Sequence, residues 1–144
     1  MTIDARWAVI TEDGGERAGN LLITDEVTVG ELVQELSDPM ADLARLIHCD
    51  RPLYDEEHGF RDHDVYANVV DGFGYLSHQD RNHDKAYPVG DPRSEGCEFD
   101  DDDFPPGSGL PLETFTAVLG EFLRTAERPT AVTWRGFDPE AAAE

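Results

Sequence analysis

Positive charge is scarce in this sequence. Eleven Lys and Arg residues stand against 32 Asp and Glu residues, which gives a formal net charge of −21. Nucleic acids and anionic membranes gain nothing from a surface of their own sign, so both are poor partners for this chain. The natural complement is a basic protein, or a basic site on one. The alternative explanation is an adaptation for solubility that involves no partner.

Cysteine and long apolar runs are also scarce. Cys49 and Cys97 are the only cysteines, too few for a disulfide framework. They could pair, but we favour buried free thiols in a reducing cytoplasm. No apolar run reaches the roughly 18 residues of a membrane-spanning helix, and no charged start followed by an apolar run resembles a secretory signal. We therefore expect a cytoplasmic protein.

The remaining composition is that of a globular protein. The 144 residues are 39% hydrophobic and include seven Phe and two Trp. That is enough apolar material to build a core without disulfides, and it argues against disorder. We expect a single domain over residues 1–144, with a frayed Ala-rich tail at 139–144.

The N-terminal half shows strand patterns followed by a helix pattern. Apolar alternation at 6–11 and 20–24 predicts a hairpin. A helix should then begin at Thr28, in a capping box with Glu31, and run to about Ser37. Its inner face is formed by Val29, Leu32, Val33 and Leu36.

The centre of the chain predicts a second hairpin. Residues 41–49 fit either a strand or a helical turn, and the polar residues 50–63 indicate an exposed loop. Segments 64–70 and 74–78 then flank Asp71-Gly72, a strong tight-turn signal. Gly72 and Gly74 are explained by this hairpin.

The C-terminal region carries the largest apolar block. Pro111 suits the first turn of a helix, and Arg128-Pro129 ends that helix because the residue before proline avoids the α region. A short strand at 130–134 follows, and Trp7 and Trp134 are expected in the core. The helix is predicted by apolar residues at i, i+3, i+4 and i+7 spacing: Leu112, Phe115, Val118, Leu119 and Phe122.

Three blocks of this sequence resemble a known family. The run GSGLPLETFTAVLGEFLRTAERPTAVTW carries Phe122-Leu123, Thr125, Arg128-Pro129 and Trp134 in the order of a family ending, and GFGYLSHQD (72–80) and YPVGDP (87–92) resemble two upstream blocks. The family is the type-one immunity proteins of bacterial polymorphic toxin systems. The resemblance implies a small α+β protein that binds and neutralises a toxin and catalyses nothing. Its layout favours a strand near 44–49.

Residues 79–111 lack any periodic apolar pattern. A 33-residue irregular stretch inside a compact domain is usually functional or disordered. Between 91 and 104 it carries seven acidic residues and one basic residue. Such a run is either a solvated tract or a surface for a basic partner, and the resemblance favours the second. A calcium loop needs alternating ligands and a distal Glu, and this run has neither.

We interpret this segment as the toxin-binding surface. A toxin cleft that grips a nucleic-acid backbone would supply Lys and Arg, and aromatic anchors ringed by charge are typical of binding hot spots. The aromatic residues could instead attach the loop to the body. The expected electrostatic contacts are Asp80, Asp84, Asp91, Glu98, Asp100, Asp101, Asp102 and Asp103, with Tyr87, Phe99 and Phe104 as anchors.

The histidines provide the rival hypothesis of a metal-dependent hydrolase. His58 and His63 are five residues apart, as are His78 and His83, and aspartates lie beside both pairs. Imidazole with carboxylate suits a divalent metal. However, neither pair has the i, i+4 spacing of a helical metal site, and both fall largely in expected loops, so we interpret them as exposed loop histidines. No nucleophile elbow or phosphate-binding glycine loop occurs.

Together these observations predict an α+β fold with a mainly antiparallel sheet of about six strands and two principal helices on one face. The expected function is an immunity protein that occludes the basic cleft of a toxin, either a nucleic-acid deaminase or a nuclease. We expect no enzymatic activity, cofactor or metal, and neither nucleic acid nor membrane as partner. A plain acidic interaction module without a toxin partner is the remaining alternative.

Overall fold

The computed structural model describes residues 1–99 and 102–136. Its centre is an antiparallel sheet in which seven strands follow the order β12-β8-β7-β6-β3-β1-β2, and β11 adds a short pairing to β7. The expected α+β class with a mainly antiparallel sheet is confirmed, with more strands than the six expected. The strands are β1 (Ile3–Ile10), β2 (Glu16–Ile23), β3 (Ala44–His48), β6 (His63–Val70), β7 (Phe73–Asp80), β8 (His83–Pro88), β11 (Leu110–Pro111) and β12 (Trp134–Gly136).

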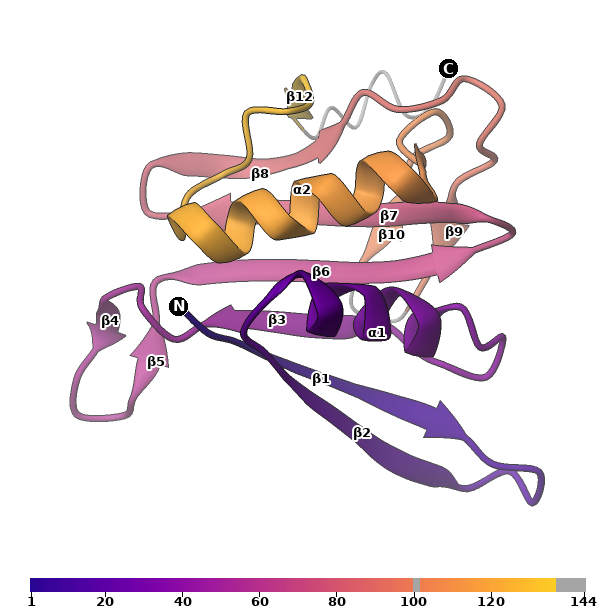
Figure 1. Cartoon of the computed structure of the whole chain (residues 1–144), viewed down its shortest axis with the longest axis horizontal. Helices are drawn as coiled ribbons and strands as arrows, with labels where there is room; N and C mark the ends of the chain where they lie inside the picture. Colours follow the sequence, from indigo (N-terminus) through magenta and orange to yellow (C-terminus); the bar gives the residue numbers. More distant parts are fainter. Residues whose placement is uncertain (100–101, 137–144) are drawn as a thin grey trace.

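Two helices pack beside each other against this sheet. In Figure 1, α1 (Glu26–Leu36) crosses in front of β3 and α2 (Leu112–Thr125) crosses in front of β7. The strands alternate in the usual way, so one side chain in two points toward the helices. On β1 these are Ile3, Ala5, Trp7 and Val9, which join Leu32, Leu36, Phe115, Val118, Leu119 and Phe122 in the main core.

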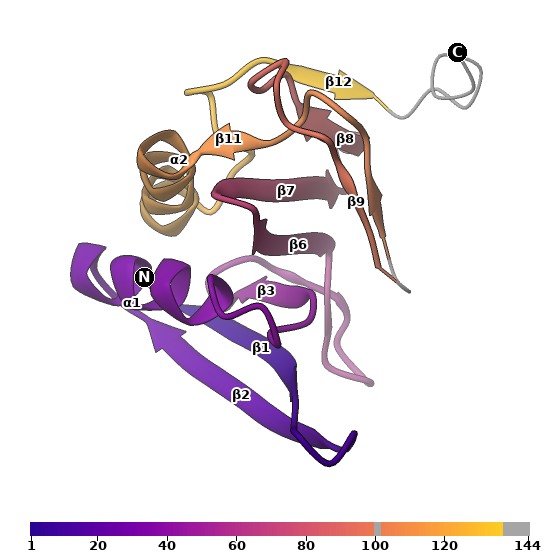
Figure 2. The same cartoon turned by 90° about the vertical axis from the view of Figure 1, so that its right-hand side faces the viewer.

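Four remaining short strands lie outside the main sheet. The strands β4 (Leu53–Asp55) and β5 (Phe60–Arg61) pair with each other, as do β9 (Cys97–Glu98) and β10 (Asp103–Phe104). Figure 2 shows β9 on the side of the sheet away from both helices. A second apolar cluster, centred on Tyr75, Tyr87 and Phe104, joins this segment to the sheet. Tyr75 is buried.

The first helix begins one turn earlier than its expected cap. Asp25 is the N-cap, and its carboxylate accepts the Thr28 N–H at 2.9 Å, while the Thr28 hydroxyl accepts the Asp25 N–H at 3.1 Å. Thr28 is therefore the third helical residue of the capping box and not its first, and Glu31 takes no part. The predicted inner face of Val29, Leu32, Val33 and Leu36 is buried, as expected.

The second helix and the strand after it also differ from expectation in detail. Pro111 occupies the N-cap position and pairs with Phe73, so it precedes the first turn. The expected strand at 130–134 begins only at Trp134. The reason is that the Glu121 carboxylate accepts the N–H groups of Thr130 and Ala131 at 2.6 and 3.0 Å, which withdraws them from any ladder.

Two segments that were expected to be irregular contain short β-strands. The strand near 44–49 is confirmed as β3, but the expected exposed loop at 50–63 contains β4, β5 and the buried residue Arg51. The expected irregular stretch 79–111 contains β8, β9, β10 and β11. Three of these four strands have only two residues, too few to produce a periodic signal.

Some residue-level expectations also change. Trp7 is buried, whereas Trp134 is only partly buried, with the Arg128 guanidinium 5.5 Å from its ring centroid. Cys49 and Cys97 are both free, but neither is buried as expected, because Cys49 is exposed and Cys97 is only partly buried. The expected frayed tail at 139–144 lies outside the described residues. Within the described part of the chain, no helix has the length and apolar character needed to cross a membrane.

Candidate functional site: the acidic segment

The acidic segment, residues 89–109, is fixed to the sheet by aromatic packing. The Phe104 ring contacts Tyr75, Tyr87 and Phe99, with centroid distances of 5.7, 5.9 and 6.1 Å. Tyr75 and Tyr87 come from β7 and β8, and both rings point away from the helices toward β10. The segment is therefore packed on the sheet by apolar contact and not merely tethered at its ends.

A buried carboxylate adds a polar anchor to this packing. The Asp102 side chain is fully buried and accepts hydrogen bonds from the hydroxyls of Ser77 and Tyr87, the latter at 2.8 Å. The ammonium of Lys85, the only lysine in the sequence, lies 2.8 Å from the same carboxylate. A buried carboxylate is tolerated only with such a set of donors. Asp102 is thus an internal contact of the fold.

The exposed edge of the segment carries acidic residues without cationic partners. Glu98 and Asp103 face each other directly across the β9–β10 ladder, and both are exposed. Like charges directly opposite each other destabilise a strand pair. Glu95 is exposed nearby. In residues 1–99 and 102–136, no Lys, Arg or His forms an ion pair with any of these three carboxylates.

The negative field of the segment acts on neighbouring ionisable groups. Burial raises the pKa of the Cys97 thiol to about 12, and the charges of Asp102, Asp103 and Asp71 add to that increase. Burial likewise raises the pKa of Tyr87, with a further contribution from its hydrogen bond to Asp102. The same negative charges would attract a cation that approaches this surface.

The structure divides the predicted toxin contacts into accessible and internal residues. Asp84, Glu98 and Asp103 are exposed, and Asp91 and Phe99 are partly exposed. Asp91 is also neutralised by Arg93, with Oδ2 and Nη2 2.6 Å apart, which helps to hold its pKa at about 2. The other predicted contacts are buried, namely Asp80, Tyr87, Asp102 and Phe104, or lie outside the described residues, namely Asp100 and Asp101.

Tyr87 and Phe104 therefore attach the acidic segment to the sheet. This is the alternative to toxin contact that the sequence left open for the aromatic residues. The sequence did not identify Ser77 and Lys85, the other two residues of this anchor, and it did not single out the exposed Glu95 as a contact. The signal available for Lys85 was its uniqueness in a strongly acidic chain. Ser77 gave no signal, because its partner Asp102 is 25 positions away.

The histidines occupy different surroundings from those expected. His63 and His78 were interpreted as exposed loop residues, but they lie in β6 and β7 and are buried. Strand β6 begins one residue before the expected segment 64–70 and so includes His63, whereas His78 is the last residue of the expected segment 74–78. The Asp80 carboxylate accepts from His78 Nε2 and His83 Nδ1, each at 2.8 Å. Of the predicted pairs, only His58 remains an exposed residue outside the main sheet.

Burial controls the protonation of these imidazoles. Burial lowers the pKa of His63 to about 4, because a charged ring there would lose its hydration, and the nearby Arg51 charge adds to that decrease. Burial also lowers the pKa of His78. For Asp80, burial acts to raise the pKa, but the hydrogen bonds from His78, the Asn82 N–H and His83 outweigh it, so the pKa falls to about 2. The group is thus an ionised carboxylate between two imidazoles.

Comparison with known proteins agrees with the sequence blocks described above. The family model for immunity protein Imm1 matches residues 17–136, which include both helices, the acidic segment and every strand of the main sheet except β1 and the first residue of β2. No curated protein matches the chain. The match spans most of the 144 residues, so the chain belongs to the Imm1 family of immunity proteins.

Proposed function

We propose that this immunity protein neutralises a toxin domain by covering a basic substrate-binding cleft with its acidic segment. The observation that carries the proposal is the exposed Glu98–Asp103 pair on a hairpin that Asp102 and Phe104 anchor to the sheet. Two like charges held face to face raise the energy of the free protein. Lys or Arg side chains of a partner would remove that repulsion on binding.

The electrostatic balance of the whole molecule supports a basic partner. Most cations with a described contact are used within the fold: Arg6 pairs with Asp4, Arg45 with Asp64, Arg51 with Asp62, Lys85 with Asp102 and Arg93 with Asp91. The surface left over is dominated by carboxylates. Complementary charge of this kind raises association rates and makes them dependent on salt.

We infer that the toxin acts on nucleic acid, as a deaminase or a nuclease. Enzymes of both kinds hold a polyanionic backbone in a cleft lined with Lys and Arg. An acidic hairpin placed in that cleft competes with the substrate by charge alone. On this proposal the immunity protein acts in the cytoplasm, by binding and not by catalysis. The toxin-facing residues are Asp84, Glu98, Phe99 and Asp103, together with Asp91, Asp100 and Asp101.

The test is calorimetric binding to the toxin domain encoded beside the gene, at low and at high salt. The double variant Glu98→Gln/Asp103→Asn removes two charges from the hairpin. We expect it to weaken binding by tenfold or more, about 1.4 kcal/mol, and to flatten the dependence on salt.

A matched control removes two charges from elsewhere. Glu31 and Glu35 are exposed on α1 and form no ion pair within the described residues, so Glu31→Gln/Glu35→Gln changes net charge equally. It should affect affinity by less than about threefold. Equal losses in both double variants would show that net charge, and not this hairpin, controls binding. Failure of the wild-type protein to rescue growth against the co-expressed toxin would reject that toxin as the partner.

A further inference from the structure

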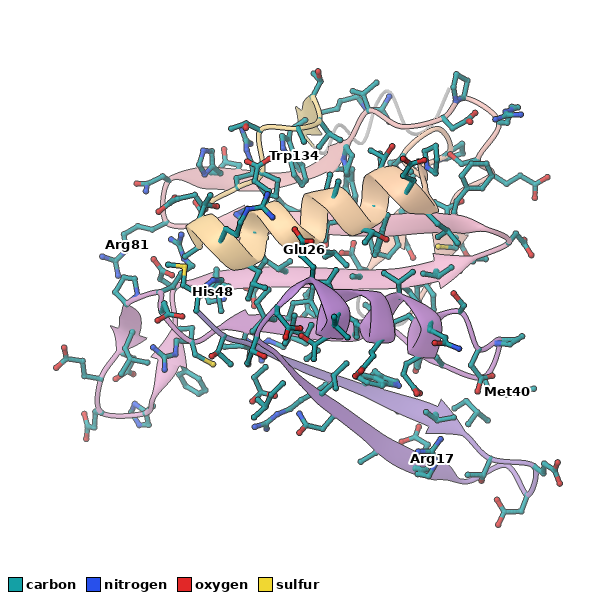
Figure 3. The ribbon with its side chains drawn as sticks, viewed as in Figure 1. Arg17, Glu26, Met40, His48, Arg81 and Trp134 are labelled. Atoms are coloured by element: carbon teal, nitrogen blue, oxygen red, sulfur yellow. The ribbon has the colours of Figure 1, made fainter. Side chains whose placement is uncertain are left out.

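The turn between β7 and β8 brings three metal-ligand side chains together. His78 and Asp80 are two residues apart on β7 and therefore point to the same side of the sheet, and His83 begins β8 directly opposite Asp80. One ligand atom from each of the three residues lies within 4.8 Å of the other two. Only Arg81 and Asn82 separate the strands, and Arg81 points away from the body of the molecule (Figure 3).

The ligand types favour an ion of the zinc kind. Two imidazole nitrogens and one carboxylate oxygen are a frequent donor set for Zn²⁺, whereas Ca²⁺ and Mg²⁺ take mainly oxygen ligands. Bond lengths of about 2.0–2.1 Å put tetrahedral ligand atoms about 3.4 Å apart. The 2.8 Å contacts of Asp80 with both rings show that the donors already converge. Small shifts of the carboxylate and of the His83 ring would admit an ion.

Burial gives the group one fixed side and one open side. The side chains of His78 and Asp80 are 1% and 0% exposed, whereas that of His83 is 31% exposed. The His78 ring is held against Phe122 and Trp134, with centroid distances of 5.7 and 5.8 Å. His78 and Asp80 therefore form a rigid half of the site, and His83 can move to admit an ion.

Two features of the surroundings bear on the strength of the site. Arg51 lies 4.0 Å from Asp80, but its charge is already paired with Asp62 at 2.7 Å. His78 Nδ1 is buried and has no hydrogen-bond partner among the described residues. When Nε2 binds an ion, the ring proton moves to Nδ1. That buried N–H then has no acceptor in the described part of the chain, whereas a metal-bound imidazole normally donates this proton to a partner, so this feature lowers the affinity of the site.

We propose that His78, Asp80 and His83 bind a zinc-type ion that joins β7 to β8. The ion replaces the two N–H···O contacts that now hold both imidazoles to the carboxylate. This proposal does not depend on toxin binding, because His78 packs against Phe122 on the helix side of the sheet, whereas the β9–β10 pair lies on the opposite side (Figure 2).

The chain offers a matched comparison group. Asp55, Glu57 and His58 also place one ligand atom each within 4.8 Å of one another. These residues lie at the β4–β5 pair, the His58 side chain is 61% exposed, and only one imidazole is present. A cluster of this kind is expected to bind zinc weakly, so it serves as the control.

The experiment uses the full-length chain without a histidine tag, stripped of metal by a chelator. Zn²⁺ is titrated in competition with a chromophoric chelator, and Co²⁺ is titrated separately while its visible absorption is recorded. We expect one Zn²⁺ per chain with a Kd of about 10⁻⁶ M or tighter, and a Co²⁺ spectrum of tetrahedral intensity.

The variants distinguish this site from adventitious binding. His83→Ala should weaken Zn²⁺ binding by about 100-fold or more and abolish the Co²⁺ bands, while His58→Ala should leave both unchanged. His83→Gln still offers Asp80 a hydrogen-bond donor but is a poor zinc ligand, so it should weaken binding even if His83→Ala fails to fold. Absence of stoichiometric binding, or binding that survives His83→Gln, would overturn the proposal.

Discussion

Arg51 and Asp62 form a buried bidentate ion pair at the C-terminal end of α2. Arg51 Nε lies 2.7 Å from Oδ1 and Nη2 lies 2.8 Å from Oδ2, with the two side chains 5% and 2% exposed. Arg51 Nη1 also donates to the Ala126 carbonyl at 2.7 Å, next to the last turn of the helix. The pair therefore satisfies a helix end and joins the segment before β4 to α2.

Replacing Arg51 by Ala should destabilise the protein strongly. The change leaves the Asp62 carboxylate buried without its partner and the Ala126 carbonyl without its donor. Removing one member of a buried ion pair lowers the free energy of unfolding by about 3–5 kcal/mol. Urea denaturation measures the loss, and Arg45→Ala is the control. The Arg45–Asp64 pair is 3.3 Å long and about half exposed on both sides, so its loss should cost no more than about 1 kcal/mol.

The stability of the protein should fall between pH 6.5 and pH 4 because of His63. Its pKa is about 4 in the folded state and about 6.5 in the unfolded state. The unfolded chain therefore binds more protons in this interval, and the free energy of unfolding decreases as the pH falls through it. The contribution is up to about 3 kcal/mol, fully present above pH 6.5 and lost by about pH 4.

Denaturation at several pH values, with a chelator present, tests this prediction. His63→Gln removes the titrating ring and should reduce the slope between pH 6.5 and 4. His58→Gln removes a histidine whose side chain is 61% exposed and serves as the control variant. An unchanged slope in His63→Gln would assign the acid sensitivity to other groups.

Gly74 should not tolerate a methyl group. A Cβ at this position on β7 would lie 2.1 Å from ring carbons of Phe115, which is buried in α2. The ring fills the space where a side chain would stand, so Gly74→Ala should destabilise by about 1–3 kcal/mol or more. A Cβ added to Gly30, in the middle of α1, would meet no atom within 4 Å. Gly30→Ala should therefore stabilise by about 0.5–1 kcal/mol in the same thermal or urea measurement.

Asp102→Ala should loosen the acidic segment. It leaves the hydroxyls of Ser77 and Tyr87 without their acceptor in a buried setting, at a cost of about 1–3 kcal/mol. Lys85 is 35% exposed and can turn to solvent. Hydrogen exchange should show reduced protection of the β9–β10 pair. Asp103→Ala, which removes an exposed carboxylate from the neighbouring position, should leave the protection unchanged or increase it, because the repulsion with Glu98 disappears.

The sequence pattern within single segments predicted the long helices and strands, but it did not predict the two-residue strands. The 3.6-residue spacing from Leu112 to Phe122 placed α2, and the Asp71-Gly72 turn placed the β6–β7 hairpin, because both signals lie within a few neighbouring residues. The two-residue strands β9, β10 and β11 have no period to detect. Their conformation follows from the partner strand and not from their own sequence.

The candidate site was likewise predictable from the sequence only in part. The acidic composition of 91–104 indicated a charged surface, but it could not separate Asp102 from Asp103, which are adjacent in sequence. One is buried against Ser77, Tyr87 and Lys85, and the other is exposed opposite Glu98. In an extended strand adjacent side chains point to opposite faces, so the register of β10 decides which aspartate is structural and which meets a partner.

By itself the sequence determined the fold class, the two helices, the acidic character and the family. The first three depend on composition or on patterns within single segments, and the family depends on three sequence blocks that occur in the order of the family. Only the tertiary structure decided which ionisable groups are internal, because burial depends on packing between segments that lie far apart along the chain. Arg51 meets Ala126 and His48 meets Leu123, both across 75 positions. Figure 3 shows His48 near the C-terminal end of α2. Such contacts form only when packing brings distant segments together, and no local pattern encodes them.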